Sequence, residues 1–384
     1  MFSSVSTKTT AAQAQAMRFA SFSTNSLVCN SSVITGGHLP LSSFPTMRLP
    51  DGEDRVQRIT YLAEVRNRLL QPLEASYAGN SSGFRSAADI KFDKILFIND
   101  VFFNPLDAVQ LLFSTNGGKG TAEYRAACAI DFVCGIMFYD SFVVRDTDGF
   151  GMGLMFYPWF TTSGSGTSRA FVQSQKDAVP VRSCWGGMAA FNASLFQTRR
   201  SKLPLSETRL EPVSSSDPHT KPQLPLRFRS SQEPFWEAAE CCLIFADIEA
   251  LYGDPNVENG TGVFINPYIR IAYSQTTWEW LPIFRRFERM FEYLQYVVSM
   301  IGYPEYNPRR LHEAGQLVEE TVWVSASEHD AASVGHFMRV RREAAPGGFC
   351  GQRRMFVMKR DLETANTGGT GKNWEKIRVP PGAR

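Results

Sequence analysis

Apolar residues recur every three or four positions between residues 58 and 72. Ile59, Leu62, Val65 and Leu69 follow this spacing, which places them on one face of a helix. A proline at position 72 does not continue a helix, because it lacks a backbone donor. The pattern therefore predicts an amphipathic helix that ends near Pro72.

The hydrophobic pattern then changes to short continuous runs. Residues 95–98 form such a run, which predicts a buried parallel strand, and Asn99 and Asp100 end it. A helix is predicted from about 105 to 113, and a second run, YRAACAIDFV, again leads to an acid, Asp131. This alternation predicts an α/β sheet with polar ligands at the carboxyl ends of its strands.

The second half of the chain combines an insertion with three further elements. Residues 201–233 are rich in proline, serine and charge and predict an exposed insertion. A helix is predicted from near Trp236, and GVFINPYIRIAYS predicts a strand that breaks at its proline. Residues 283–301 predict a core-facing helix, with a helix on a membrane surface as the alternative. Its apolar stripe consists of Phe284, Phe287, Phe291, Leu294, Val298 and Ile301.

Changes in composition divide the chain into parts. Residues 1–54 and 346–384 predict disordered tails, and between them residues 55–302 predict the folded domain, followed by an extension at 303–345. The first residues lack the apolar core of a signal peptide, and no run of about 18 apolar residues occurs. Neither a signal segment nor a membrane span is therefore predicted.

Composition and charge narrow the possible functions. Of the 384 residues, 43% are hydrophobic, which is enough for a buried core. The 40 basic and 38 acidic residues give a net charge of +2 and are scattered, so nucleic-acid binding is not expected. The seven cysteines form no CxxC pair and no regular framework, so neither a zinc site nor a disulfide scaffold is predicted.

The run Ser183-Cys184-Trp185 is similar to part of a papain-type cysteine protease signature. That signature also requires an earlier cysteine and a glycine, but Val181 and Arg182 precede Ser183 here. We therefore do not expect a nucleophilic cysteine.

Two groups of acids are candidates for binding a divalent cation. A metal that bridges a diphosphate takes hard oxygen ligands, and one or two acids at a strand end supply them. Asp100 follows a predicted strand and precedes a helix, where an acid can equally cap the helix. Asp146 and Asp148 form an Asp-x-Asp pair in a glycine-flanked loop, where acids are commonly solvated. The residue pattern alone does not decide which of the two groups binds the cation.

Seven blocks in order, from about residue 55 to 275, resemble a known family. They are RITYLAEVRNRLLQPL, KILFINDVFF, AACAIDF, FYDSFVVRDTDG, PVRSCWGGMAAFNASLF, ECCLIFAD and GVFINPYIRIAY. The sequence resembles the fungal α-1,3-mannosyltransferases related to the capsule-associated proteins, glycosyltransferase family 69. The resemblance implies a GT-A-like α/β domain with a mixed, mainly parallel sheet. It also implies a GDP-mannose donor, an α-mannoside acceptor, Mn²⁺ or Mg²⁺, and transfer to the 3-hydroxyl with retention.

The same resemblance implies roles for individual residues. Asn99 and Asp100 take the place of the metal-binding acids, and Glu240 and Asp140 are the catalytic candidates. Glu240 has a second interpretation, an acid that favours the start of a helix. The substrate-binding candidates, of which Arg145 could face a phosphate, are Arg145, Asp146, Arg182, Ser183, Trp185 and Gly186.

Two departures from the family pattern affect what the resemblance implies for the fold and for Glu240. Relatives carry an N-terminal membrane anchor and a first βαβ unit before RITYLAEVRN, where this chain has its low-complexity stretch, so the domain is expected to lack that unit. The insertion at 201–233 also replaces the usual approach to ECCL. The family implies the Golgi or another secretory lumen. The alternative function is a truncated, non-catalytic member that binds glycans or a partner protein.

Overall fold

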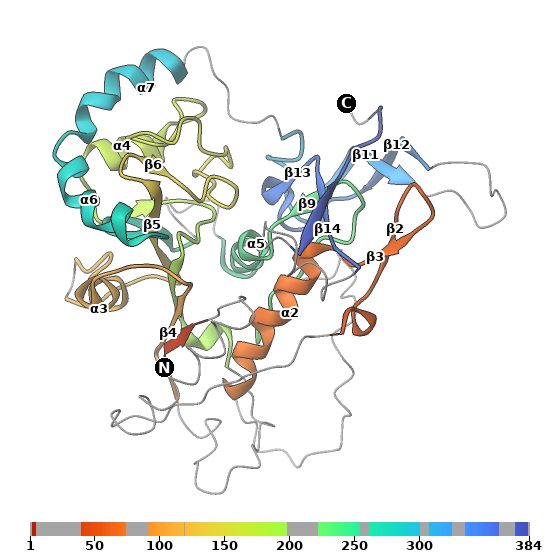
Figure 1. The fold of residues 1–384 in the computed structure, drawn as a ribbon, viewed down its shortest axis with the longest axis horizontal. Helices are drawn as coiled ribbons and strands as arrows, with labels where there is room; N and C mark the ends of the chain where they lie inside the picture. The colour runs from red at the N-terminus through yellow and green to blue at the C-terminus, as the bar shows by residue number, and fades with distance from the viewer. Residues whose placement is uncertain are drawn as a thin grey trace, which may run out of the picture.

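The computed structural model describes residues 2–4, 40–73, 91–118, 120–197, 222–253, 261–299, 307–324, 335–360 and 373–382. Its centre is a seven-stranded sheet in the order β1-β4-β8-β5-β10-β7, with β6 paired to β5 (Figure 1). The strands are β1 (Phe2–Ser4), β4 (Lys94–Ile98), β5 (Ala126–Cys134), β6 (Met137–Phe138), β7 (Val179–Pro180), β8 (Met188–Asn192) and β10 (Val263–Ala272).

The sheet is mixed, as predicted, but it is not mainly parallel. Only β1 with β4 and β5 with β10 pair in parallel, and the other four pairings of this sheet are antiparallel. The difference arises because β8 runs antiparallel between β4 and β5. The α/β class is therefore confirmed, whereas the GT-A-like fold and the missing first βαβ unit stay predictions.

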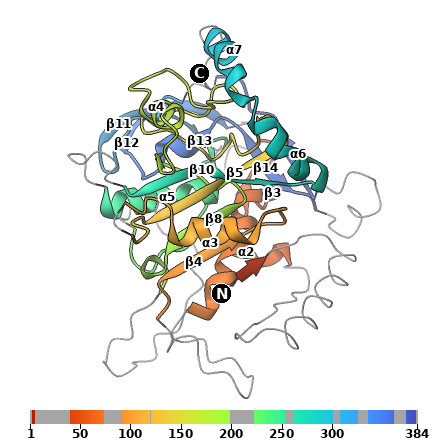
Figure 2. The same ribbon diagram turned by 90° about the vertical axis from the view of Figure 1, so that its left-hand side faces the viewer.

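Helices cover both faces of this sheet (Figure 2). On one face, α3 packs on Ala127, Ala190 and their neighbours, and on the other, α5 packs on Phe191 and its neighbours. Strand residues alternate between the two faces, as a pleated backbone requires. The helices are α2 (Arg58–Leu70), α3 (Pro105–Phe113), α4 (Thr167–Gln173), α5 (Glu240–Tyr252), α6 (Gln275–Arg285) and α7 (Phe291–Ser299). The 3₁₀ turns are η1 (Leu41–Ser43), η2 (Gln71–Leu73), η4 (Ala193–Leu195), η5 (Glu288–Met290) and η6 (Gly348–Cys350).

Several of the observed elements agree with those predicted from the sequence. The predicted helices at the first apolar stripe and at 105–113 are confirmed as α2 and α3. The predicted break in the strand that contains Pro267 is confirmed, because the register of β10 against β5 shifts between Ile265 and Arg270. The helix expected near Trp236 begins only at Glu240, because Glu237 and Ala238 form β9 instead.

Segments that were expected to be tails carry short strands. Met47–Arg48 (β2) pairs with Asp54–Arg55 (β3), and Met355–Met358 (β14) pairs with Trp374–Ile377 (β15). Leu49 and Val357 lie in one buried cluster, so hydrophobic packing joins these two ends of the chain. The remaining strands are β9 (Glu237–Ala238) with β13 (Gly351–Gln352), and β11 (Leu317–Val324) with β12 (His336–Glu343).

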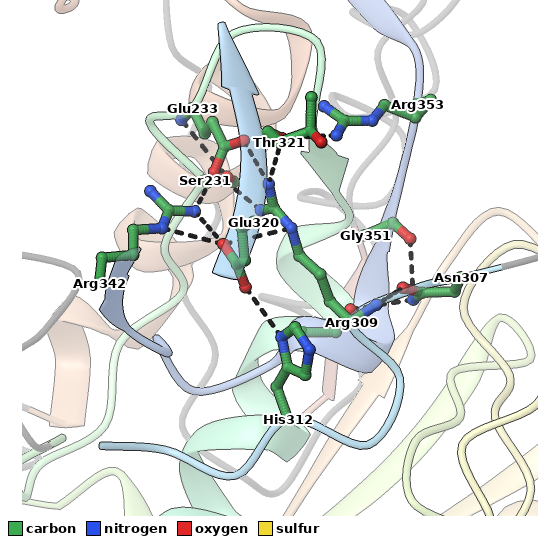
Figure 3. A network of polar contacts seen from close by, with 11 residues as sticks. Ser231, Glu233, Asn307, Arg309, His312, Glu320, Thr321, Arg342, Gly351 and Arg353 are labelled. Atoms are coloured by element: carbon green, nitrogen blue, oxygen red, sulfur yellow. Dashed lines mark hydrogen bonds and ion pairs between the residues drawn. The ribbon is translucent and has the colours of Figure 1, made fainter. Parts of the chain in front are cut away.

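Paired charges attach the β11–β12 hairpin to the domain (Figure 3). Glu320 on β11 contacts Arg309 and Arg342 at 3.3 and 2.5 Å, and both arginines also contact Glu233. The arginines hold the pKa of Glu320 below its usual range, although burial acts to raise it. Glu233 belongs to the region predicted as an exposed insertion. The part of that region that is described, 222–233, instead packs on the domain, and 201–221 lie outside the described residues.

Two disulfides are present, although the cysteine pattern predicted no disulfide scaffold. Cys128 on β5 is bonded to Cys184, and Cys242 on α5 to Cys350 in η6. The bonded cysteines are 56 and 108 residues apart in the sequence, so the spacing of cysteines along the chain did not indicate these pairs. Cys184 is thus a structural residue, in agreement with the expectation that it is not a nucleophile.

The prediction of one core-facing helix over 283–301 is wrong. The segment divides into the end of α6, η5 and α7, and Phe287 and Leu294 of the apolar stripe are exposed. Residues 300 and 301 lie outside the described residues. Across the described part of the chain, none of the helices has the length and apolar character needed to cross a bilayer.

Candidate active site

Two aspartates meet where β5 and β6 form a hairpin. Asp131 lies within β5, and the antiparallel return of the chain brings Asp140 back beside it. The backbone N–H of Asp140 donates to Oδ1 of Asp131 at 3.0 Å, and the hydroxyl of Tyr273 donates to Oδ2 at 2.9 Å. Asp131 is fully buried, so these bonds are the means by which the structure compensates for its lost hydration.

Burial raises the pKa of both carboxyl groups. For Asp131 the charge of Asp140 raises the pKa further. For Asp140 the N–H of Gly186 and the charge of Arg66 oppose the effect of burial without cancelling it. Two neighbouring carboxylates resist ionising together, so the pair retains a proton at a pH where ordinary aspartates have lost theirs.

A glycine turn positions Asp140. Gly186 and Gly187 have φ angles of +53° and +62°, and the N–H of Gly186 donates to Oδ2 of Asp140 at 3.1 Å. A Cβ on Gly186 would collide with the carbonyl oxygen of Ala129. Only glycine therefore fits this turn without displacing β5.

The same turn brings the predicted metal ligands close to the aspartates. Asn99 donates its backbone N–H to the carbonyl of Gly187 at 2.9 Å. A Cβ on Gly187 would lie 3.0 Å from Val101 and 3.1 Å from the hydroxyl of Tyr273. The segment that contains Asp100 thus lies beside the tyrosine that bonds to Asp131. Two exposed aromatic residues, Tyr139 and Phe102, flank this region.

Asp100 is exposed at the end of β4. Within the residues that the structure describes, no group of three or more His, Cys, Asp or Glu side chains could hold a metal ion. A divalent cation bound together with a diphosphate commonly takes only one or two carboxylates and receives its other ligands from phosphate and water. Asp100 fits that kind of site and does not fit a cage made of protein ligands alone.

Glu240 forms a buried ion pair with Arg66. Arg66 on α2 reaches Oε1 of Glu240 at 2.6 Å, and its guanidinium lies 4.2 Å from the ring centroid of Trp185. Burial acts to lower the pKa of Arg66, but Glu240 and its other neighbours, including Asp140, raise it overall. Glu240 also lies in the first turn of α5, where an acid favours the start of a helix, as its second interpretation requires.

The run Ser183-Cys184-Trp185 directly precedes the glycine turn that holds Asp140. Ser183 is fully buried and donates to the carbonyl of Val143 at 2.6 Å, and Trp185 packs among Phe97, Phe191 and Phe228. These contacts are all within the protein, and the predicted contact of Ser183 and Trp185 with substrate stays a prediction.

Arg145 and Arg182 are both occupied within the protein. Nε of Arg145 donates to the carbonyl of Phe349 at 2.8 Å, and its Nη1 donates to two further carbonyls. Arg182 forms a two-pronged pair with Glu249 at 3.0 and 2.6 Å. A phosphate-binding role for Arg145 stays a prediction.

Asp146 and Asp148, the Asp-x-Asp pair, form hydrogen bonds that stabilise the loop in which they lie. Oδ1 of Asp146 accepts from the backbone N–H groups of Phe150 and Asp148, and Oδ2 of Asp148 accepts from Ser165. Burial raises the pKa of Asp146 to about 7. Both loop acids are thus engaged by their own loop, whereas Asp100 is exposed.

Sequence reasoning missed three members of the cluster: Asp131 as a site residue, Arg66 and Tyr273. The available signal was an acid within an apolar run, AIDFV, because a buried strand rarely tolerates an unpaired carboxylate. A cavity of about 540 Å³ lies elsewhere, against α4 and α7, and none of the predicted site residues lines it.

Comparison with known proteins places the chain in a family. Neither a curated protein nor a solved structure matches it. Residues 1–247 match the family model described as Cryptococcal mannosyltransferase 1. This range contains the aspartate pair, Asp100 and the first turns of α5, and the match confirms the resemblance to mannosyltransferases related to capsule-associated proteins. Because the match covers more than half of its length, the chain belongs to the Cryptococcal mannosyltransferase 1 family.

Proposed function

We propose that this protein is a mannosyltransferase that moves mannose from GDP-mannose to the 3-hydroxyl of an α-mannoside, with retention and in a GT-A-like fold. The observation that carries the proposal is the Asp131–Asp140 pair, held by Gly186 and Tyr273 beside the exposed Asp100. Family membership supports the transferred sugar. The nucleotide, the linkage and the retention come from the sequence resemblance.

Each aspartate has a distinct task in this proposal. Asp131 keeps a proton because it is fully buried, and Asp140 carries the charge because Gly186 and Arg66 favour its ionised form. A carboxylate at Asp140 stabilises the positive charge that develops on the sugar ring as its bond to phosphate breaks. It also orients the acceptor hydroxyl, whose oxygen forms the new bond while its proton leaves with the diphosphate.

In the proposal, Asp100 and Asn99 would hold Mn²⁺ or Mg²⁺ through their side-chain oxygens. When bound, the cation offsets the charge of the departing nucleoside diphosphate. Asp100 thereby fixes the donor next to Asp140, since the glycine turn joins the two segments.

The proposed location is the Golgi or another part of the secretory lumen. The two disulfides support it, because disulfides persist in oxidising compartments. Association with a membrane, as the family resemblance implies, is part of the same proposal.

The test is transfer of labelled mannose by the purified chain. GDP-mannose and a short α-mannoside are incubated with Mn²⁺ and then with a chelator, and the product is sized and its linkage determined. We expect a 1,3-linked product that disappears with chelator. Binding of the mannoside without any transfer, by a chain whose melting temperature GDP-mannose and Mn²⁺ do not raise, would overturn the proposal in favour of a glycan-binding protein.

A further inference from the structure

The cavity of about 540 Å³ against α4 and α7 lies outside the candidate active site. Both ribbon views place the two helices next to each other (Figures 1 and 2). Arg169 and Gln173 line the cavity from α4, and Glu292, Tyr293 and Tyr296 line it from α7. A hollow of this volume that combines aromatic rings with a few polar groups is typical of a site for a small molecule.

Arg169 is held in the wall of the cavity by buried hydrogen bonds. It is 6% exposed, and its Nη1 donates to the carbonyl of Phe160 at 2.9 Å and to Oε1 of Gln295. Gln295 is fully buried on α7 and donates to the same carbonyl at 3.2 Å. Among the described residues, neither Nε nor Nη2 of Arg169 has a hydrogen-bond partner. Because a buried guanidinium is costly unless its donors are used, these two nitrogens point to a ligand rich in oxygen.

The orientation of α7 supplies two aromatic rings to the same cavity. Its inward side carries the buried Gln295, whereas Tyr293 and Tyr296 are 82% and 51% exposed. A surface helix normally turns its apolar side to the core and its polar side to water. The two tyrosines are three positions apart, so they are neighbours on the helix surface. Core packing does not account for this arrangement, which leaves both rings available to a molecule in the cavity.

The charged groups of the cavity favour a neutral ligand. Of the described residues that line it, Arg169 and Glu292 are charged, and their charges have opposite signs. Burial lowers the pKa of Arg169, and the charge of Glu292 opposes this effect. Glu292 accepts from Nε2 of Gln173 at 2.6 Å. A guanidinium only donates, a carboxylate only accepts and an amide does both, so hydroxyl groups, which also do both, match this set.

Trp159 connects the cavity with the aspartate pair. It precedes Phe160, whose carbonyl accepts from Arg169. The ring centroid of Trp159 lies 6.4 Å from that of Phe132, the residue after Asp131. The cavity is therefore next to the part of the sheet that carries the candidate catalytic carboxyl groups.

We propose that this cavity binds a neutral sugar unit of the glycan acceptor, distant along the glycan from the mannose that reacts at Asp140. The C–H groups of the pyranose ring pack on Tyr293 and Tyr296, and its hydroxyls bond to Arg169 and Glu292. That this sugar belongs to the acceptor rests on the proposed function, whereas the binding of a neutral sugar in the cavity does not. Engagement at two places raises the affinity for a long glycan without any further contact at the reacting sugar.

Titration calorimetry of the full chain with an α-linked mannotetraose, without GDP-mannose or metal, tests the sugar site. We expect binding, and we expect Tyr293→Ala together with Tyr296→Ala to weaken it about tenfold. The matched control is Phe113→Ala, at an exposed aromatic residue of α3, which should leave the affinity unchanged. Inorganic phosphate should not compete with the tetraose. Equal melting temperatures establish that the variants fold.

Transfer assays separate this inference from the proposed function. In the two-tyrosine variant we expect the KM for the tetraose to rise about tenfold with kcat unchanged, because only binding away from the reacting sugar is lost. The KM for methyl α-mannoside, which is too short to reach the cavity, should stay the same. No transfer by any chain would overturn the proposed function, and calorimetry would still decide the sugar site.

Three calorimetric results would overturn the sugar site. They are a wild-type chain that does not bind the tetraose, an affinity that the two-tyrosine variant retains, and displacement of the tetraose by phosphate. The second result would assign the binding to another place on the protein, and the third would assign Arg169 to an anion.

Discussion

The backbone N–H of Gly186 donates to Oδ2 of Asp140 at 3.1 Å. This bond joins the glycine turn that precedes β8 to the residue that follows β6, and Tyr273 and the end of β4 lie next to the same turn. Because the turn tolerates no side chain at Gly186, the distance between Asp140 and β5 is fixed by backbone contacts. The carboxylate is therefore held in place before any substrate arrives, as electrostatic stabilisation of a transition state requires.

Replacing Asp140→Asn tests its proposed task. The amide keeps the shape of the side chain and removes its charge, so we expect mannosyl transfer to fall about 100-fold or more while the KM for GDP-mannose changes little. The measurement is steady-state transfer together with the melting temperature. Asp177→Asn is the control, since Asp177 is exposed and accepts a bond from the backbone N–H of Asn116. A variant with near wild-type kcat would remove Asp140 from the reaction.

Local signals in the sequence predicted the elements that depend on nearby residues. The spacing of Ile59 and Leu62 is sufficient for α2, and Asn104 caps α3 by accepting from Leu106, immediately before a proline at the first helical position. The position of Asp100 just after a strand was predicted in the same way, because Asp100 follows a short apolar run. These features require no knowledge of the remainder of the chain.

Features that depend on distant residues were missed or wrongly predicted. Cys242 and Cys350 are separated by 108 residues in the sequence and meet through the packing of α5 and η6. Asp131 was taken to end a strand, but it lies within β5, and its partner Asp140 arrives through the β6 hairpin. The stripe through Leu294 has helical spacing, yet the buried Gln295 shows that spacing alone does not identify the side that faces the core.

The Arg66–Glu240 ion pair offers a test of the two interpretations of Glu240. Arg66→Met leaves a buried carboxylate without its partner, which costs about 3–5 kcal/mol of unfolding free energy. Adding Glu240→Leu removes the unpaired charge, so we expect most of the lost stability to return, as measured by denaturant unfolding.

The rates of mannosyl transfer by these variants distinguish the two interpretations of Glu240. The Arg66→Met chain keeps Glu240 and reports the effect of losing Arg66 alone. If Glu240 acts on the substrate, transfer by the double variant is lower than transfer by this control, and we expect that result. Equal transfer by the two chains would leave Glu240 with a structural role only.

Asp146 predicts a dependence of stability on pH. Its pKa rises from 3.8 to about 7 on folding because the carboxyl is buried. A group whose pKa is raised in the folded state contributes stability that is complete below its unfolded pKa and is lost as the pH rises through its folded pKa. This contribution is therefore lost between about pH 4 and pH 7.

Asp146→Asn removes that dependence. Relative to the wild type, we expect the variant to gain stability across this interval, by up to about 4 kcal/mol at neutral pH for a shift of about three units. The measurement is the difference in unfolding free energy between the two chains at each pH. A difference that is the same at pH 4 and pH 7 would contradict the prediction.

The Cys242–Cys350 disulfide joins α5 to the turn that receives the Arg145 hydrogen bond through Phe349. Replacing both cysteines by serine is expected to cost about 3–5 kcal/mol of unfolding free energy, because the link restricts the unfolded chain. Cys134→Ser is the control, since Cys134 is not disulfide-bonded. The control should lose stability on reduction to the same extent as the wild type, and the double variant should lose less.

Asp100→Asn distinguishes the two candidate metal sites. Asp146 and Asp148 already accept hydrogen bonds from their own loop and from Ser165, whereas Asp100 is exposed beside the glycine turn. An amide is a weaker ligand than a carboxylate for a hard cation. We therefore expect Asp100→Asn to abolish the Mn²⁺-dependent rise in melting temperature with GDP-mannose, and Asp148→Asn to preserve it. The reverse result would move the cation to the loop and leave Asp100 as a residue of the strand end. Loss of the rise in both variants would show that the donor site extends across both segments.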